Sequence, residues 1–370
     1  MSVFNVELKK VVDDSYDIEM GYRLEDQLVE DLETGLLGKI RKFAVITDSN
    51  VLDLYAKPIS EKLSKAGFKV ELFVFPAGEK SKTRQTKAKI EDAMLEKGFR
   101  RDCAVIAIGG GVVTDLAGFL AGTYGRGVPF INYATTLLAA ADASVGGKTG
   151  INFNGLKNEI GSFAPADSVL IETEFLRSLD AQNFFSGYAE MLKHGLISNT
   201  AHWVELLDFN TNNIDYAYLK NMVGRSVQVK EDIVEQDPFE RGIRKALNLG
   251  HTAGHAFESL ALAENRPVLH GYAVAWGIVC ELYLSHLKVG FPKDKMRQTI
   301  QFIKENYGSF AFDCKQYEQL YAFMQHDKKN TSGTVNFTLL KEIGDICINQ
   351  TADKDTIFEM LDFYRECMGV

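Results

Sequence analysis

The chain has 370 residues, of which 46% are hydrophobic and 25% charged, and its 41 Lys and Arg against 50 Asp and Glu give a formal net charge of −9. This composition is typical of a globular protein long enough for two domains. The absence of a basic excess argues against a general nucleic-acid binder, which needs many cations to displace counterions from the phosphates. An anionic small substrate remains possible, because a local group of lysines can bind it.

The cysteines and the N-terminus indicate a reducing compartment. The five cysteines are odd in number, widely spaced and without a CxxC pair, which argues against a disulfide framework and a thiolate zinc site. Residues 1–10 lack the apolar segment of an export signal. Nowhere do about eighteen apolar residues run together, as a membrane-spanning helix requires. We therefore expect a cytoplasmic protein without a membrane partner.

The first half of the chain alternates strand-like and helix-like segments. Two short alternating segments, residues 4–8 and 16–20, predict a hairpin at the edge of a sheet. Further strands are predicted at 43–47, 70–75, 103–108, 130–133 and 168–172, and helices at 24–37, about 51–65, 83–97 and 113–124. Strands and helices alternating at this interval predict a parallel sheet with helices on both faces.

Residues 103–158 carry a glycine turn followed by polar groups spaced between apolar runs. Gly109, Gly110 and Gly111 follow a predicted strand and precede a predicted helix, so backbone amides there can bind a phosphate group. A glycine turn alone is more often an ordinary turn. Here the polar residues that follow favour a binding site; they are Asp115, Thr135, Thr136, Asp142, Lys148, Lys157 and Asn158.

Past residue 174 the pattern becomes helical. Segments of 3.6-residue period cover 184–197, 216–236, 246–263 and 272–287, and strand-like alternation returns only at 334–340. The sequence therefore predicts an α/β protein of two domains, with a parallel-sheet domain at 1–174 and a mainly helical domain at 175–370.

The second domain contains a candidate metal site. His251 and His255 are spaced to share one face of a helix, and Glu190 and Lys193 are similarly spaced on another. With His270, these histidines and the glutamate favour a catalytic zinc over isolated structural histidines, although the spacing leaves open whether His255 is a ligand or an acid–base. Lys193 lies in a helix that looks buried, so it needs either a carboxylate of the fold or a substrate anion as partner.

Five motifs resemble the 3-dehydroquinate synthase family, a member of the sugar-phosphate cyclase superfamily. They are residues 109–116 (GGGVVTDL), 142–149 (DASVGGKT), 156–158 (LKN), 187–193 (GYAEMLK) and 248–255 (NLGHTAGH). The resemblance runs from about residue 47 to about residue 344. It implies a Rossmann-like NAD-binding domain followed by a mainly helical domain that carries the metal and binds the substrate.

The resemblance also implies roles for individual residues. The zinc ligands would be Glu190, His251 and His270, with Co²⁺ a plausible substitute for Zn²⁺, and His255 would lie beside the reacting centre. The NAD contacts would be Asp48, Asn50, Glu79, Lys82, Gly110, Gly111, Val112, Asp115, Thr135, Thr136, Asp142, Lys148 and Lys157. The substrate contacts would be Arg126, Lys148, Asn158, Lys193, Lys230, Arg244, Asn248 and Lys328 or Lys329. Arg126 would reach the partner subunit's site, which implies a homodimer.

The implied reaction is a phosphate-eliminating lyase reaction of the shikimate pathway. The substrate would be 3-deoxy-D-arabino-heptulosonate 7-phosphate, a seven-carbon phosphorylated keto acid, and the products 3-dehydroquinate and phosphate. Transient oxidation by NAD would be followed by elimination of phosphate, re-reduction and intramolecular aldol closure.

Two departures and three alternatives accompany this interpretation. Tyr272 stands where the family commonly has Glu, and Ala134 where it usually has Pro. If that glutamate is a hydrogen-bond partner of the histidine ligand, its absence puts in doubt how the protein tunes the metal, though not the ligands themselves. The alternatives are a related cyclase acting on another sugar phosphate, an NAD- and metal-dependent polyol dehydrogenase, and an inactive binding or scaffold protein. The many cations argue against the dehydrogenase, and the retained ligands argue against the inactive protein.

Overall fold

The computed structural model describes residues 13–153, 156–325 and 334–370. The strand predicted at 4–8 and the two lysines Lys328 and Lys329 lie outside the described residues. Among the helices that are described, none combines the length and the apolar character needed to cross a membrane.

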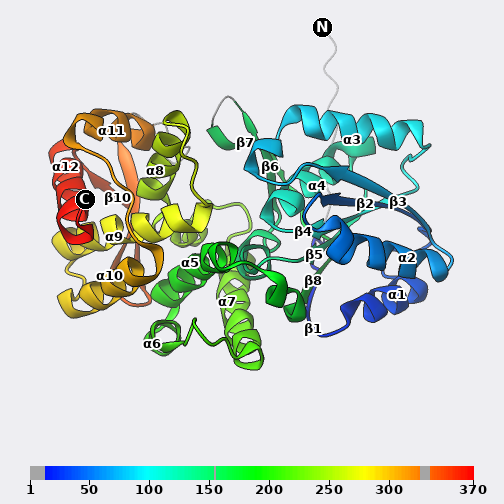
Figure 1. Ribbon diagram of the computed structural model, residues 1–370, viewed down its shortest axis with the longest axis horizontal. Coiled ribbons are helices and arrows are strands. Elements are labelled where there is room, and N and C mark those ends of the chain that lie inside the picture. Colours follow the sequence, from blue (N-terminus) through cyan, green and yellow to red (C-terminus); the bar gives the residue numbers. More distant parts are fainter. Residues whose placement is uncertain (1–12, 154–155, 326–333) are drawn as a thin grey trace, which may run out of the picture.

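Six parallel strands form the central sheet of the first half (Figure 1). They are β1 (Asp17–Gly21), β2 (Lys42–Asp48), β3 (Lys69–Phe75), β4 (Ala104–Gly109), β5 (Phe130–Ala134) and β8 (Ser168–Glu172). Their order across the sheet is β1-β8-β5-β4-β2-β3. The prediction of a parallel α/β sheet is confirmed.

Alternate side chains of the central strands enter two cores on opposite faces. The helices of this half are α1 (Leu24–Thr34), α2 (Lys57–Lys65), α3 (Arg84–Glu96) and α4 (Gly111–Thr123). In β2, Phe43 and Val45 share a core with α1 and α2, whereas Ala44 and Ile46 share a core with α3 and α4. Strands covered on both faces need continuous apolar runs, which is why these strands were recognisable in the sequence.

The strand order creates a switch point between β2 and β4. After β2 the chain forms β3 at one edge of the sheet. It then returns to form β4 on the other side of β2, and β5 and β8 extend the sheet in that direction. Loops diverge at such a point, and open α/β sheets bind their ligands there, at the carboxyl ends of the strands.

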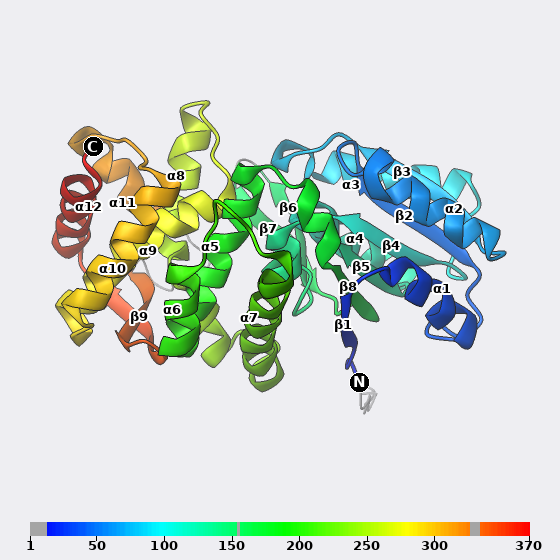
Figure 2. The ribbon, with the colours of Figure 1, turned by 60° about the horizontal axis from the view of Figure 1, so that its bottom comes forward.

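The second half is mainly helical. Its helices are α5 (Ala181–Ser198), α6 (Thr200–Asp208), α7 (Tyr216–Gln236), α8 (His251–Ala263), α9 (His270–Val289), α10 (Lys293–Tyr307), α11 (Tyr317–Gln325) and α12 (Lys354–Met368). The antiparallel strands β9 (Val335–Glu342) and β10 (Asp345–Ala352) complete this half. In Figures 1 and 2, α5 and α7 lie between the sheet and the remaining helices.

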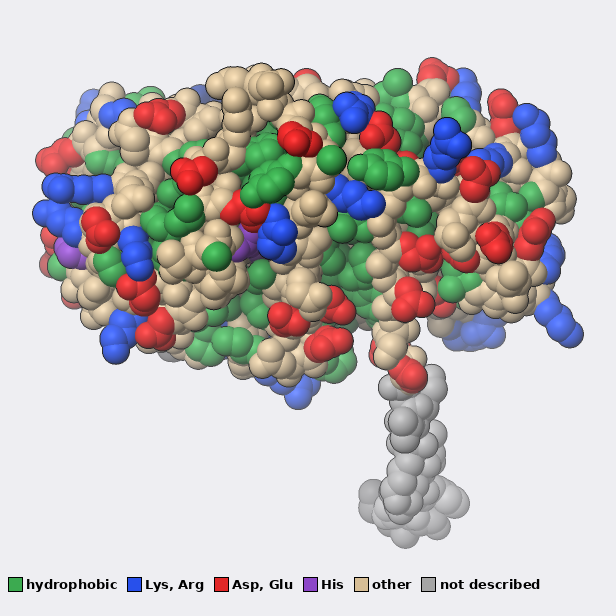
Figure 3. Space-filling view, turned by 90° about the horizontal axis from the view of Figure 1, so that it is seen from below, with side chains coloured by type: hydrophobic (Ala, Val, Ile, Leu, Met, Phe, Trp, Pro, Cys, Tyr) green, Lys and Arg blue, Asp and Glu red, His purple; other side chains and the backbone are tan. Residues whose placement is uncertain are grey.

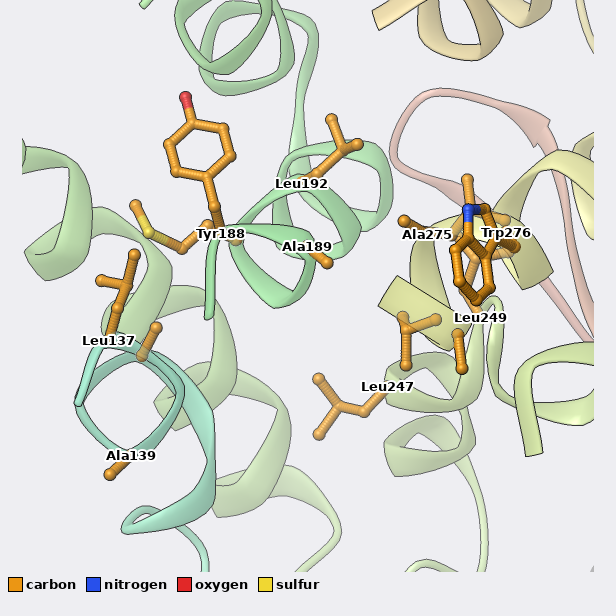
Figure 4. Packing of buried hydrophobic residues seen from close by; sticks show 14 of the residues in the cluster. Leu137, Ala139, Tyr188, Ala189, Leu192, Leu247, Leu249, Ala275 and Trp276 are labelled. Carbon is orange, nitrogen blue, oxygen red and sulfur yellow. The ribbon is translucent and has the colours of Figure 1, made fainter. Parts of the chain in front are cut away.

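One apolar core runs through both halves. Leu137 and Ala139 of the first half belong to the same cluster as Tyr188 and Leu192 of α5 and Leu249 before α8 (Figure 4). The last strand of the sheet ends at Glu172 and the first helix of the second half begins at Ala181. The domain boundary near residue 174 stays a prediction.

Several local predictions differ from the structure. The segment at 16–20 pairs in parallel with β8 as β1, so the described part of the predicted hairpin is an edge strand of the main sheet. The helix predicted at 246–263 starts only at His251, because Gly250 has a φ of 80° and separates it from a short 3-10 turn at Ile243–Asn248. The antiparallel pair β6 (Lys148–Phe153) and β7 (Leu156–Phe163) was not predicted.

Candidate active site

The residues predicted to bind the dinucleotide gather at the carboxyl ends of four neighbouring strands. Asp48 ends β2, Glu79 follows β3, Gly110 follows β4 and Thr135 follows β5. Oδ1 of Asp48 accepts hydrogen bonds from the backbone N–H groups of Asn50 at 2.8 Å and Val51 at 3.1 Å, which fixes the turn after β2. The structure therefore brings these residues together at the switch point of the sheet, whereas Asp142 and Lys148, also predicted to bind NAD, lie among the residues assigned to the substrate.

The glycine turn lets the start of α4 approach the loop after β5. A Cβ at Gly110 would lie 2.8 Å from Cγ2 of Thr136, so only glycine permits this approach. No side chain caps α4 at Gly110, so its N-terminal amides suit an anion such as a pyrophosphate. The hydroxyl of Thr135 is buried and has no hydrogen-bond partner in the described structure. These features fit a bound dinucleotide.

Lys82 connects two of the predicted contacts. Its buried ammonium donates to a carboxylate oxygen of Asp115 and to Oδ1 of Asn158, the latter at 2.6 Å. Burial raises the pKa of Asp115, although Lys82 opposes the shift. Asn158, which the resemblance assigned to the substrate, thus lies among the residues assigned to the cofactor.

Close packing of α9 on α5 brings two candidate metal ligands together. His270 is the first residue of α9, and a Cβ on the next residue, Gly271, would lie 1.8 Å from the backbone oxygen of Ser186. Any larger side chain at Gly271 would therefore push α9 away from α5. This contact holds His270 beside Glu190 of α5.

A buried carboxylate fixes the start of α8. Glu281 of α9 accepts hydrogen bonds from the backbone N–H groups of Gly250 at 2.6 Å, Thr252 at 2.9 Å and Ala253 at 3.2 Å. A negative charge at a helix N-terminus is stabilised by the helix dipole. The position of His251, the first residue of α8, follows from these contacts.

Four donor side chains converge between α5, α8 and α9. Oε1 of Glu190 lies 3.6 Å from Nε2 of His251 and 3.3 Å from Nε2 of His270. This oxygen is buried and has no hydrogen-bond partner among the described residues. One ring nitrogen each of His251, His255 and His270 lies within 4.8 Å of the others. Nitrogen and carboxylate oxygen are the donors that zinc and cobalt accept, so the residues fit such an ion.

Hydrogen bonds at Nδ1 orient two of the imidazoles. Nδ1 of His251 lies 3.1 Å from the backbone oxygen of Leu249, and Nδ1 of His270 lies 3.1 Å from Oε2 of Glu258. Each Nδ1 therefore carries a hydrogen, and each Nε2 is directed toward Glu190. Burial holds the pKa of His251 well below its usual value. Burial also disfavours the charged form of His270, but Glu258 and Glu190 outweigh it and raise the pKa to about 9.

Lys193 is paired with two carboxylates of the fold. Its Nζ donates to Oε2 of Glu190 and lies 3.6 Å from Oδ1 of Asp142, which is 2.9 Å from Nζ of Lys230. Burial disfavours the charged ammonium, yet Asp142 and Glu190 raise the pKa of Lys193. The ion pair with Glu190, one of the two partners considered for this lysine, is therefore present. Because it uses Oε2, Oε1 of Glu190 remains directed at the histidines.

Other predicted substrate residues meet at Glu240. Oε2 of Glu240 lies 2.6 Å from Nζ of Lys148, and its Oε1 accepts a hydrogen bond from Nδ2 of Asn248 at 2.8 Å. Arg244 is 1% exposed and donates to the backbone oxygen of Gly146 at 2.6 Å. Its Nε is buried without a hydrogen-bond partner in the described part of the chain. Four of the cations assigned to the substrate thus lie in one region next to the candidate metal ligand Glu190; they are Lys148, Lys193, Lys230 and Arg244.

Arg126 lies at the opposite end of α4 from the glycine turn. It is exposed, has a φ of 71°, and ends the turn after α4. The 13 residues of α4 separate it from the glycine turn by roughly 20 Å along the helix axis.

Tyr272 packs against other aromatic side chains. Its ring centroid lies 6.0 Å from that of Trp276 and 5.2 Å from that of Tyr307.

Two carboxylates of the site were missed in the sequence. Glu258 lies seven residues after His251 on α8, hence on the same face of that helix, and this spacing could have revealed it. Glu240 lies in the loop after α7 with a φ of 59°, and no spacing in the sequence relates it to the other site residues.

On the face seen in Figure 3, acidic and basic side chains are interspersed.

The comparisons with known proteins cover most of the chain. The family described as 3-dehydroquinate synthase N-terminal matches residues 72–186, and the family described as 3-dehydroquinate synthase C-terminal matches residues 187–330. A 3-dehydroquinate synthase of Parabacteroides distasonis is 51% identical over 332 residues, which are 90% of this chain and 94% of that protein.

Solved structures of related cyclases share the fold. ValA, the 2-epi-5-epi-valiolone synthase of Streptomyces hygroscopicus subsp. jinggangensis 5008 with NAD⁺ and Zn²⁺ bound, is 26% identical, with a TM-score of 0.85 over 98% of this chain and 99% of that one. A 2-deoxy-scyllo-inosose synthase complexed with carbaglucose-6-phosphate, NAD⁺ and Co²⁺ is 23% identical, with a TM-score of 0.81 over 94% and 96% of the two chains. Since both family matches and the 51% identity extend over most of the sequence, the chain belongs to the 3-dehydroquinate synthase family.

Proposed function

We propose that this protein is a 3-dehydroquinate synthase, which converts 3-deoxy-D-arabino-heptulosonate 7-phosphate to 3-dehydroquinate and phosphate. The observation that carries the proposal is the position of Oε1 of Glu190, 3.6 Å and 3.3 Å from the Nε2 atoms of His251 and His270, next to the buried cation Lys193. A metal donor set beside cations suits a substrate that is both a secondary alcohol and an anion.

The residues that would hold the two cofactors fit them chemically. Glu190, His251 and His270 would bind a zinc or cobalt ion, and the loops after β2 to β5 would bind NAD. When bound, the metal ion would lower the pKa of the substrate's alcohol, and NAD would accept a hydride and return it within the same cycle.

The lysines would bind and orient the substrate. It carries about three negative charges, which several convergent cations can bind despite the negative net charge of the chain. Lys148 and Asn248 are both held by Glu240, and the substrate's anionic groups would take over this contact. Holding one conformer of a flexible seven-carbon chain lowers the entropic cost of the later ring closure.

His255 is proposed to move a proton at the reacting centre. It lies on α8 one turn after His251, and the two ring centroids are 5.4 Å apart. An imidazole beside the metal ligands can accept a proton from a substrate hydroxyl and return it.

We further propose a homodimer that acts in the cytoplasm. Arg126 is exposed at the end of the turn after α4, so it is accessible to a partner subunit, whose site it would reach. The five cysteines are all free thiols, which supports a reducing compartment.

A related cyclase acting on another sugar phosphate is the second candidate. The identity of 51% to a 3-dehydroquinate synthase, against 26% and 23% to cyclases of other products, favours the first. Measuring phosphate release from the seven-carbon keto acid phosphate and from glucose 6-phosphate at equal concentration separates the two. Release from glucose 6-phosphate alone would overturn the proposal.

A further inference from the structure

Glu258 connects a candidate metal ligand to a candidate nucleotide contact. Its Oε2 lies 3.1 Å from Nδ1 of His270, and its Oε1 accepts a hydrogen bond from Nζ of Lys157 at 2.5 Å. Lys157 belongs to β7 in the first half of the chain, whereas Glu258 and His270 belong to α8 and α9 in the second. One carboxylate therefore contacts both halves of the site.

The contact is built into the fold. Only 7% of Glu258 is exposed, and a buried carboxylate is costly unless hydrogen bonds and an opposite charge compensate it. Among the described residues, Oε1 contacts Lys157 and Oε2 contacts His270. His270 has its other ring nitrogen 3.3 Å from Glu190, and Lys157 lies 3.9 Å from Glu79, another residue at the nucleotide end.

We infer that Glu258 is a positioning residue that orients His270 for the metal and, through Lys157, couples metal binding to NAD⁺ binding. The inference rests on the proposed function. A carboxylate that accepts the Nδ1–H of a ligating histidine fixes the ring and makes Nε2 a stronger donor. Tyr272, where the family commonly has a glutamate, packs here against aromatic rings.

The sign of the coupling follows from the shared carboxylate. The phosphates of NAD⁺ compete with Glu258 for the ammonium of Lys157. When the ammonium of Lys157 contacts the phosphates, it no longer neutralises the charge of Glu258. The carboxylate then acts on His270 alone and makes its Nε2 a stronger donor, so the metal binds more tightly. By thermodynamic linkage, the metal must raise the affinity for NAD⁺ by the same factor.

The experiment compares the affinity for Zn²⁺, measured by competition with a chromophoric chelator, in the presence and absence of saturating NAD⁺. The full-length wild-type chain is compared with Glu258→Gln, Lys157→Met and the control Glu264→Gln. Glu264 lies just after α8, is paired with Arg266 and lies outside the site, so this control makes the same chemical change elsewhere. The melting temperature of each metal-free variant is measured on the same preparation.

Each variant has a distinct expected result. In the wild type and Glu264→Gln, NAD⁺ should raise the affinity for Zn²⁺ by about fivefold or more. Glu258→Gln should bind Zn²⁺ about tenfold to a hundredfold more weakly and lose the effect of NAD⁺. Lys157→Met should lose the effect of NAD⁺ while binding Zn²⁺ at least as tightly as the wild type does.

Two outcomes would overturn the inference, and only the second would also overturn the proposed function. A wild type that binds Zn²⁺ and NAD⁺, with Glu258→Gln unchanged in Zn²⁺ affinity and coupling, would refute the inference and leave the proposed function intact. A wild type that binds neither Zn²⁺ nor NAD⁺ would refute both. If Glu258→Gln lowers the melting temperature, the Lys157→Met result still decides the coupling.

Discussion

Oε1 of Glu190 and Nε2 of His270 lie 3.3 Å apart, on two helices that touch at Gly271. The carboxylate of Glu190 is divided between two functions: Oε2 pairs with Lys193, while Oε1 is buried without a hydrogen bond in the described structure. A buried oxygen that accepts no hydrogen bond needs another partner. A metal ion bound by Oε1 of Glu190 and Nε2 of His270 would be such a partner.

The metal is expected to depend on His251. His251→Ala should remove one donor and lose bound zinc while the chain stays folded, and chelation of the wild type should abolish activity until zinc or cobalt is added back. Metal content by elemental analysis and far-ultraviolet circular dichroism check this. His286→Ala, at the far end of α9, is the control, because His286 contacts the backbone oxygen of Phe291 instead of the site. A His251→Ala protein with full metal content would show that the ligand assignment is wrong.

Lys193→Met should reduce both stability and turnover. The substitution leaves the buried carboxylate of Glu190 without its ion-pair partner, while Asp142 keeps Lys230; breaking a buried pair costs about 3–5 kcal/mol of the free energy of unfolding. Turnover by the folded fraction should fall about a hundredfold or more, if the ammonium contacts the substrate in the transition state. Denaturant unfolding and specific activity are measured on one preparation. A destabilised protein with normal turnover would mean that Lys193 serves the fold alone.

Activity should decline at alkaline pH because of Lys148. The surrounding protein desolvates its ammonium more than Glu240 stabilises it, so the pKa of Lys148 is lowered to about 8 although 44% of its side chain is exposed. Below this pKa the lysine is charged and binds the anionic substrate; above it the charge is lost. We therefore expect kcat/KM, which reports the free enzyme, to fall above about pH 8.

Lys148→Arg is the test of that assignment, because an arginine stays charged throughout the range. The alkaline fall should move to higher pH in this variant. An unchanged pH profile would assign the fall to another group.

Gly271→Ala should disrupt the metal site through packing alone. The added Cβ would lie 1.8 Å from the backbone oxygen of Ser186, so α9 must move away from α5 and take His270 with it. Overpacking of this kind costs about 1–3 kcal/mol or more, and zinc affinity should fall with it. Thermal unfolding and metal content check both effects. Gly224→Ala is the control, since its Cβ would meet only the flexible end of Met20, at 2.9 Å; equal loss in both variants would contradict the packing argument.

The sequence revealed those parts of the fold that have local signals. Every residue of β4 is buried, so its apolar run was recognisable, and α7 lies at Tyr216–Gln236 as its period predicted. The partner of β1 had no such signal, because β8 is about 150 residues away and an edge strand can pair in several ways. The start of α8 was misjudged because the helical period continues through Gly250, whose φ of 80° breaks the helix.

The site shows the same limit. Motif resemblance named Glu190, His251 and His270, which the structure brings together, but it did not show that Lys193 and Glu190 form an ion pair or that Asn158 contacts Lys82. The contact of Asn158 depends on the unpredicted β6–β7 hairpin, whereas Glu190 and Lys193 lie three residues apart on α5, so the sequence showed their spacing but left the partner of Lys193 open. Glu240 reaches Lys148 from a loop, so only the folded chain reveals that contact.

The most direct test of the proposed function follows phosphate and NADH together. Purified protein with zinc and a catalytic amount of NAD⁺ is given 3-deoxy-D-arabino-heptulosonate 7-phosphate, and phosphate release and absorbance at the NADH band are recorded in one cuvette. We predict many equivalents of phosphate per NAD⁺, formation of 3-dehydroquinate and no net NADH, because the hydride returns to the product in every cycle. NADH that accumulates in step with substrate consumption would contradict this and identify a dehydrogenase.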